Sequence, residues 1–258
     1  MRANRSLQAL ILGGSSSIGC AIARSLAADG FEIHLTYHRN LQGAQKLVEE
    51  IRSHGGVAEL HAVDAGAMDG LKAFIGDAFA DSRRLGVVVN CIGVSEITSL
   101  VAPDALKKWA RCVDVNMNFM FTLANLTLPL LIANGRGRWI NISSVSASEV
   151  RDGVGCYSVT KAAQNHLVKF FAKEAGPDVT VNSICPGMTY TPHLEISNRK
   201  IAELRGITLE QINAEILSAT ATKRFVDPDE IGAAVSYLCS PAARSITGVS
   251  LNISGGRG

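Results

Sequence analysis

The chain has 258 residues, of which 47% are hydrophobic, so it is long and apolar enough to form a single α/β domain with a large core. Its formal net charge of +2 at pH 7 is too small to indicate a nucleic-acid partner and suits a small or acidic organic substrate better. The six cysteines include no CxxC pair, and the apolar run near the N-terminus is too short for a signal peptide or a membrane span. These features predict a cytoplasmic protein with reduced thiols.

The first half of the chain alternates short apolar strands with helices. We predict strands at residues 8–12, 32–36, 57–64 and 87–91. Helices are expected at residues 41–53 and 68–80, and from the glycine turn at 13–19 to about residue 29. This alternation predicts a parallel sheet with right-handed crossovers.

The second half continues the alternation with one long interruption. A helical region is expected over residues 103–133, with a bend or restart at Pro129, then a strand at 138–142, a helix at 157–175 and a strand at 179–184. Residues 189–222 break the pattern and carry one or two short helices, which is typical of a substrate lid. A helix at 228–238 and a strand at 250–253 follow. The whole pattern predicts a single-domain, doubly wound parallel sheet of the Rossmann type over residues 1–258, with helices on both faces.

The glycine turn after the first strand is the first candidate binding element. Its serines offer hydroxyls beside the amides of a helix N-terminus, which favours a pyrophosphate ligand. An ordinary glycine-rich turn between a strand and a helix has the same pattern. The residues assigned to this contact are Gly13, Ser15, Ser16, Ser17, Ile18 and Gly19.

The residues after the second strand indicate which dinucleotide binds. A carboxylate there would hold a ribose 2′-hydroxyl, but the sequence has His38 and Arg39 instead. An arginine at this place favours a 2′-phosphate and therefore NADP(H), unless Arg39 is only a solvated surface charge. Asp64 and Ala65, after the third strand, are assigned to the adenine, although Asp64 is equally suited to cap the next helix.

Residues 142–161 place three kinds of polar group where one carbonyl could meet them. Ser143 and Ser144 follow a predicted buried strand, and Tyr157 and Lys161 lie four residues apart on one face of a predicted helix. The carboxyl end of a strand is a common place for a site in an open α/β sheet. The histidines do not combine with acids in a metal-ligand pattern and no serine lies in a GxSxG turn, so we expect neither a metal site nor a serine-hydrolase triad.

Together these motifs resemble those of the classical short-chain dehydrogenases/reductases over nearly the whole chain. LGGSSSIG (12–19) is similar to the family's TGxxxGIG, NCIG (90–93) to its NNAG, and CPGMTYT (185–191) to its PGxxxT segment under the nicotinamide. Leu12, Ser17, the pair Cys91 and Ile92, and Ser254 depart from the family's usual residues. The resemblance adds these expected cofactor contacts: Asn90, Gly93, Pro186, Gly187, Thr189 and Thr191.

The resemblance also implies a catalytic tetrad of Asn116, Ser144, Tyr157 and Lys161, and the family's spacing selects Ser144 over Ser143. Tyr157 would protonate the developing alkoxide, while the Lys161 ammonium would lower the pKa of the phenol and hold the nicotinamide ribose. Ser144 would bind the carbonyl oxygen as an oxyanion donor does. Asn116 would hold a water that connects Lys161 to solvent.

Within this family the sequence is most similar to the 3-oxoacyl-acyl carrier protein reductases, in YSVTK, CPGMTYT and KRFVDPDEI (223–231). The resemblance implies NADP(H)-dependent reduction of a 3-oxoacyl or polyketide-like ketone to a secondary alcohol. It also implies a homotetramer and docking of an acidic acyl carrier protein near Arg138 and Lys173. Substrate choice resides in residues 146–156 and 189–222. Two alternatives stay open: a dehydrogenase of another small or cyclic secondary alcohol, and a non-catalytic dinucleotide sensor.

Overall fold

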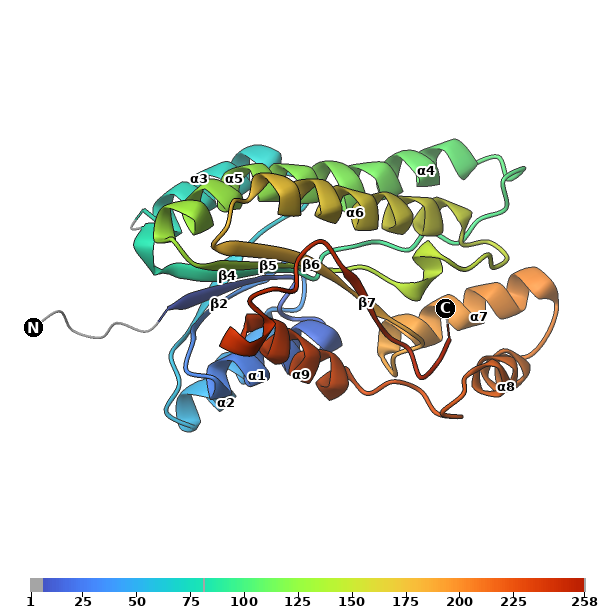
Figure 1. The fold of residues 1–258 in the computed structure, drawn as a ribbon. Helices are drawn as coiled ribbons and strands as arrows, with labels where there is room; N and C mark the ends of the chain where they lie inside the picture. Colours follow the sequence, from blue (N-terminus) through green and yellow to red (C-terminus); the bar gives the residue numbers. More distant parts are fainter. Residues whose placement is uncertain (1–6, 81, 258) are drawn as a thin grey trace, which may run out of the picture.

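The computed structural model describes residues 7–80 and 82–257, so the basic residues at the N-terminal end of the chain, 1–6, lie outside it. Its centre is a parallel sheet with the strand order β3-β2-β1-β4-β5-β6-β7 (Figure 1). The strands are β1 (Gln8–Leu12), β2 (Glu32–Tyr37), β3 (Ala58–Ala62), β4 (Leu85–Asn90), β5 (Gly137–Ile142), β6 (Val179–Pro186) and β7 (Ser250–Ile253). This order confirms the predicted doubly wound sheet, whose direction of winding reverses between β1 and β4.

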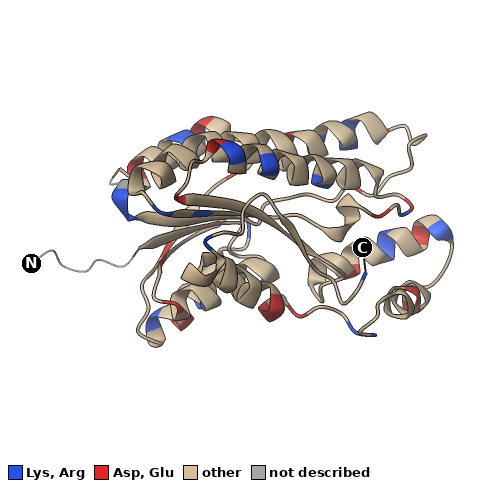
Figure 2. Ribbon diagram, viewed as in Figure 1, with Lys and Arg blue, Asp and Glu red and all other residues tan. Residues whose placement is uncertain are grey.

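Helices cover both faces of the sheet (Figure 1). One face carries α1 (Ser17–Ala28), α2 (Leu41–Ser53) and α9 (Pro228–Cys239), and the other carries α3 (Met68–Ala78), α4 (Ala105–Val113), α5 (Phe119–Asn134) and α6 (Gly155–Glu174). Successive strand residues point to opposite faces of the sheet. Ile11 therefore packs in the core under α1, α2 and α9, and Leu10 packs in the core under α3, α5 and α6. Figure 2 shows both signs of charge scattered over the helices rather than gathered on one of them.

The helical region expected over residues 103–133 is irregular before Pro129 and not at Pro129. A π-helical segment, η2 (Asp114–Asn118), joins α4 to α5, and α5 continues through Pro129 to Asn134. The helix therefore does not restart at Pro129. Proline removes the bond to the carbonyl of Asn125, but both residues are exposed, so water can satisfy that carbonyl. The irregular turn at η2 instead places the buried Asn116 beside the site.

Residues 189–222 are more ordered than a loop with short helices. They form α7 (Pro192–Arg205) and α8 (Leu209–Ala219), which Gly206 joins in the left-handed conformation at φ +64°. Both helices lie beyond the carboxyl ends of the strands (Figure 1) and share an apolar cluster with the loops there. This cluster includes Val145, Val154, Met188, Ile201, Ile212 and Ile216.

Within the described ranges, one stretch, Ala105–Asn134, is long and apolar enough to span a membrane by composition alone. It packs on the sheet, because Phe119, Leu123 and Leu131 are buried in the core that α5 shares with α6. It is therefore a core helix of the domain.

Candidate functional site

The turn between β1 and α1 is built for close backbone approach. Gly13 has a φ of +73°, and its N–H donates to Thr36 Oγ1 at 3.0 Å. Ser16 caps α1, because its Oγ accepts from the Gly19 N–H at 3.0 Å and donates to the Gly13 carbonyl at 2.9 Å. A Cβ on Gly19 would lie 2.5 Å from the Gly13 carbonyl oxygen, so only glycine fits there. Ser17, which replaces the usual glycine of the family, has no positive φ and causes no strain.

The segments that follow β2 and β3 contact each other next to this turn. His38 Nδ1 lies 3.3 Å from Asp64 Oδ1, and this oxygen also accepts from the Gly66 N–H at 2.9 Å. Asp64 therefore stabilises a turn and does not cap α3, whose N-cap residue is Ala67. Arg39 is exposed and extends from the same edge of the sheet. Asp64, His38 and Arg39 lie together where a dinucleotide's adenosine half is expected.

A cavity of about 490 Å³ opens at the carboxyl ends of the central strands. It brings together the turn between β1 and α1 (residues 13–19, the phosphate turn), the segment after β6 and three members of the predicted tetrad. The predicted site residues that line it are Ser15, Ser16, Ser17, Ile18, Gly93, Ser144, Tyr157, Lys161, Pro186, Gly187, Thr189 and Thr191. The predicted residues that do not line it are Gly13, Gly19, His38, Arg39, Asp64, Ala65, Asn90 and Asn116.

Asn90 and Asn116 do not line the cavity but hydrogen-bond to the backbone of the loop after β4. Asn90 donates to Asn141 Oδ1 at 3.0 Å and accepts from the Ile92 N–H at 3.2 Å, which fixes the loop after β4. Asn116 is fully buried, and its side chain bonds both backbone groups of Val94, at 2.8 and 2.9 Å. Both side chains therefore hold the backbone in place and do not face the cavity.

Lys161 is connected to Asn116 through a side chain that the sequence analysis missed. Lys161 Nζ donates to the Ile142 carbonyl at 2.9 Å and to Gln164 Oε1 at 3.0 Å. Gln164 Nε2 in turn donates to the carbonyl of Asn116 at 2.5 Å. Gln164 thus joins Lys161 to the backbone of Asn116 inside the protein, and the water that would connect Lys161 to solvent stays a prediction. Its position one turn after Lys161 on α6 is the only sequence signal that could have pointed to it.

Burial is the main cause of the pKa shifts of Tyr157 and Lys161. It raises the pKa of Tyr157 to about 12, against a smaller opposing effect of the Ser144 hydroxyl. It also lowers the pKa of Lys161 to about 8. Lys161 Nζ lies 5.6 Å from the centre of the Tyr157 ring, and the predicted lowering of the phenol pKa by Lys161 is not found. Tyr157 is therefore a neutral phenol at pH 7.

The rest of the cavity wall was not predicted residue by residue. Arg151 and Val154 lie within residues 146–156, and α7 contributes several side chains, so the two segments expected to choose the substrate do line the cavity. Their identity as lining residues depends on how α7 packs over the strand ends, which sequence spacing does not reveal. The additional lining residues include Asn40, Cys91, Ser95, Ile97, Ser146, Arg151, Val154, Met188, His193, Ser197, Asn198 and Ile201.

Comparisons with known proteins agree with this architecture. A family model described as enoyl-(acyl carrier protein) reductase matches residues 13–257. The chain is 31% identical over 251 residues to a 3-oxoacyl-[acyl-carrier-protein] reductase of Synechocystis sp., covering 96% of this chain and 95% of the relative. It is 30% identical over 250 residues to the short-chain reductase protein NovJ of Streptomyces niveus, covering 96% and 93%.

Solved structures give the same result. A variant of actinorhodin polyketide ketoreductase with NADPH superposes with a TM-score of 0.89 at 26% identity, covering 99% of this chain and 98% of that one. A 7α-hydroxysteroid dehydrogenase with NADH gives a TM-score of 0.86 at 27% identity, covering 98% and 95%. The strand order, the site and the similarity over nearly the whole length agree, and the chain belongs to the classical short-chain dehydrogenase/reductase family.

Proposed function

We propose that the protein reduces a ketone to a secondary alcohol with NADPH. The observation that carries this proposal is the shared cavity, in which Ser144, Tyr157 and Lys161 face the same space as the phosphate turn. The similar 3-oxoacyl-[acyl-carrier-protein] reductase and the polyketide ketoreductase support a ketone substrate. A 3-oxoacyl or polyketide-like carbonyl is therefore the first substrate class to test.

The cavity suits a dinucleotide. The amides and hydroxyls of the phosphate turn lie at the N-terminus of α1, and the residues that line the cavity include no Asp or Glu. His38 and Arg39, at the end of β2, would hold a 2′-phosphate, which favours NADPH over NADH. Similar structures bind either dinucleotide, so this preference rests on His38 and Arg39.

Each of the residues Ser144, Tyr157 and Lys161 would have its own role in the reduction. When bound, the reduced nicotinamide supplies a hydride to the carbonyl carbon. Ser144 Oγ accepts a bond from the Ser146 N–H at 3.1 Å, and its hydroxyl would donate to the carbonyl oxygen when the substrate is bound. Tyr157 keeps its proton at neutral pH and gives it to that oxygen as negative charge develops. Lys161, fixed by Ile142 and Gln164, would hold the nicotinamide ribose.

Several features support the expected lid and partners. Helices α7 and α8 would form the lid, because α7 lines the cavity and both helices belong to its apolar cluster. Lys173 is exposed near the end of α6, as docking of a carrier protein requires, whereas Arg138 is half-buried on β5. Exposed apolar side chains on α4, α5 and α6, among them Leu106, Phe121 and Phe170, suit a homotetramer. We expect the protein to act in the cytoplasm.

The proposal is tested by following NADPH oxidation with purified protein and a panel of 3-oxoacyl thioesters, diketones, quinones and enoyl thioesters. Turnover of a ketone by the wild type, lost in Tyr157→Phe while NADPH still binds, is the expected result. Equal activity of Tyr157→Phe would contradict the role of the phenol. Reduction of enoyl thioesters alone would contradict the substrate class, and NADPH binding without any turnover would favour a sensor.

A further inference from the structure

Arg151 is a positive charge in the wall of the cavity, and none of the described carboxylates lies close enough to form an ion pair with it. It lies in the loop between the short helix η3 (Val145–Ala147) and α6. Lys161 is the other Lys or Arg of the cavity wall, and its ammonium is already bonded to Ile142 and Gln164. Over the described residues, the guanidinium of Arg151 makes one hydrogen bond, from Nη1 to Met188 Sδ at 3.5 Å. A thioether is a weak acceptor, so most donors of the guanidinium have no protein partner.

Two other arginines already engage the acids near Arg151. Glu149 Oε1 accepts from Arg257 Nε at 2.8 Å. Both oxygens of Glu215 accept from Arg205, at 2.7 and 3.1 Å, and Asp152 lies 3.8 Å from the same guanidinium. Within the described part of the chain, Arg151 is therefore the arginine of this group that forms no ion pair with a carboxylate.

Burial, followed by the repulsion of Arg257, lowers the pKa of Arg151 from its usual value, and the weaker attraction of Glu149 and Asp152 only partly opposes this. The guanidinium nevertheless stays charged, because its intrinsic pKa is so high. A charge held in a half-buried place without a counter-ion costs free energy, and a bound anion would offset that cost.

The position of Arg151 separates it from the phosphate turn. It also lines a second cavity, of about 410 Å³, next to Arg205, Ile212 and Arg257. No residue of the phosphate turn lines that second cavity. Arg151 therefore lies where the two cavities adjoin, at the substrate end, and is not placed for the phosphates of a dinucleotide.

We propose that the carbonyl substrate carries an anionic oxygen group, a carboxylate or a phosphate, which Arg151 binds while the carbonyl lies against Tyr157. This inference rests on the carbonyl reduction proposed above and adds the charge of the substrate to it. The planar guanidinium can bind both oxygens of such a group at once, which fixes the substrate's orientation as well as its affinity.

A matched series of β-diketones that end in a methyl ester, a carboxylate or a phosphate tests the inference. The wild type is expected to have a kcat/KM at least tenfold higher for one of the two anions than for the ester, and Arg151→Met should remove this difference. Arg151→Lys should restore part of it. The control is Arg199→Met, which removes an exposed arginine that pairs with Glu195 on α7 and does not line the cavity.

The outcomes distinguish the sources of the anion. Preference for the phosphate indicates a substrate on a phosphate-containing carrier or coenzyme, and preference for the carboxylate indicates a free acid. An ester turned over as well as both anions, or an unchanged anion-to-ester ratio in Arg151→Met, would overturn the inference while leaving carbonyl reduction intact. If none of the compounds is reduced, calorimetric titration of the same series still measures the charge preference, although carbonyl reduction fails.

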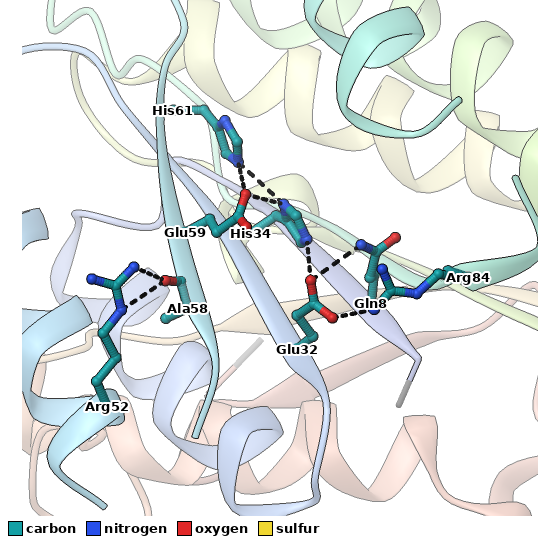
Figure 3. Close-up of polar contacts among 8 residues, drawn as sticks. All are labelled: Gln8, Glu32, His34, Arg52, Ala58, Glu59, His61 and Arg84. Carbon is teal, nitrogen blue, oxygen red and sulfur yellow. Dashed lines mark hydrogen bonds and ion pairs between the residues drawn. The ribbon is translucent and has the colours of Figure 1, made fainter. Parts of the chain in front are cut away.

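A second inference comes from a polar cluster on the edge of the sheet, far from the cavity in the fold. The strands β2 and β3 each carry a Glu-x-His pattern, Glu32 with His34 and Glu59 with His61. His34 is beside Glu59 in the parallel register (Figure 3), and Phe74 of α3 packs against His61 on this face of the sheet. His34 Nδ1 lies 3.1 Å from His61 Nε2 and 3.7 Å from Glu59 Oε2, and the last two atoms are 3.9 Å apart.

These three separations are close to what a tetrahedral zinc site needs. Bonds of about 2.0–2.1 Å at the tetrahedral angle put ligand atoms about 3.3 Å apart. The other nitrogen of His34, Nε2, lies 3.3 Å from Glu32 Oε1, and Arg84 and Gln8 hold that carboxylate from its far side (Figure 3). A histidine that donates its second N–H to a carboxylate is oriented as a metal ligand, with its Nδ1 lone pair available.

We infer that His34, Glu59 and His61 bind one Zn²⁺ ion that joins β2 to the edge strand β3. When His34 donates its Nε2–H to Glu32, its Nδ1 is an acceptor, so in the metal-free protein His61 Nε2–H would be the donor of the 3.1 Å contact. Zinc binding requires His61 to carry its proton on Nδ1 instead, so that both facing nitrogens become ligands. Two imidazoles and one carboxylate are a common zinc ligand set, which leaves the fourth position to water.

Dialysis of the chelator-treated protein against Zn²⁺, followed by elemental analysis, tests the site. We expect one ion per chain and a higher Tm in the wild type and in the exposed control His166→Gln. Glu59→Gln changes a half-exposed side chain and should fold, yet weaken Zn²⁺ binding at least tenfold. Equal Zn²⁺ content in Glu59→Gln and His61→Gln, or no ion in the wild type, would overturn this assignment.

Discussion

Gln164 offers the sharpest test of how the catalytic lysine is held. It is fully buried on α6 and joins three parts of the fold through hydrogen bonds to Asn116, Asn141 and Lys161. Replacing it by leucine keeps a similar volume but leaves two donors and one acceptor without their partner. A buried polar group that loses its partner costs about 1–3 kcal/mol. The loss of three bonds should therefore lower the free energy of unfolding by about 4 kcal/mol.

The assay is urea unfolding of Gln164→Leu, compared with Gln45→Leu as the matched control. Gln45 lies exposed on α2, and its side chain makes no hydrogen bond to any described residue, so its replacement should change the stability by less than about 0.5 kcal/mol. For a domain of this size, a loss of about 4 kcal/mol corresponds to a Tm lower by about 10 °C. Because Lys161 also loses an acceptor, NADPH should bind more weakly. A stability of Gln164→Leu within about 1 kcal/mol of the wild type would refute the reasoning.

Three further predictions concern the cofactor. Gly19→Ala should weaken NADPH binding at least tenfold, measured by fluorescence titration, because the new Cβ would lie 2.5 Å from the Gly13 carbonyl oxygen; unchanged affinity would contradict this packing. Arg39→Leu should lower kcat/KM for NADPH about tenfold and leave NADH unaffected, since a charge-assisted bond is worth about 1.5–3 kcal/mol; equal losses would contradict the phosphate assignment. The kcat/KM for NADPH should fall as pH rises through about 8, because Lys161 then loses its charge; a flat profile to a clearly higher pH would contradict this.

Sequence spacing determined the parts of the site that depend on local structure. The turn from Gly13 to Gly19 needs only the conformational freedom of glycine and a helix start, and Tyr157 and Lys161 share a face because of helical periodicity. The parallel sheet with helices on both faces followed from the alternation of strands and helices, whereas the strand order came from the structure. Ser144, Tyr157 and Lys161, which the sequence suggested would meet one carbonyl, all line one cavity.

Only the tertiary structure decided which polar groups are partners and how deeply they are buried. Gln164 reaches Asn116 across 48 positions of sequence. Burial raises the pKa of Tyr157, which Lys161 had been expected to lower. Arg151 has no carboxylate because residues distant in the sequence, such as Arg257, bind its neighbours. Such pairings depend on strand register and helix packing, which fix distances between residues that no local pattern relates.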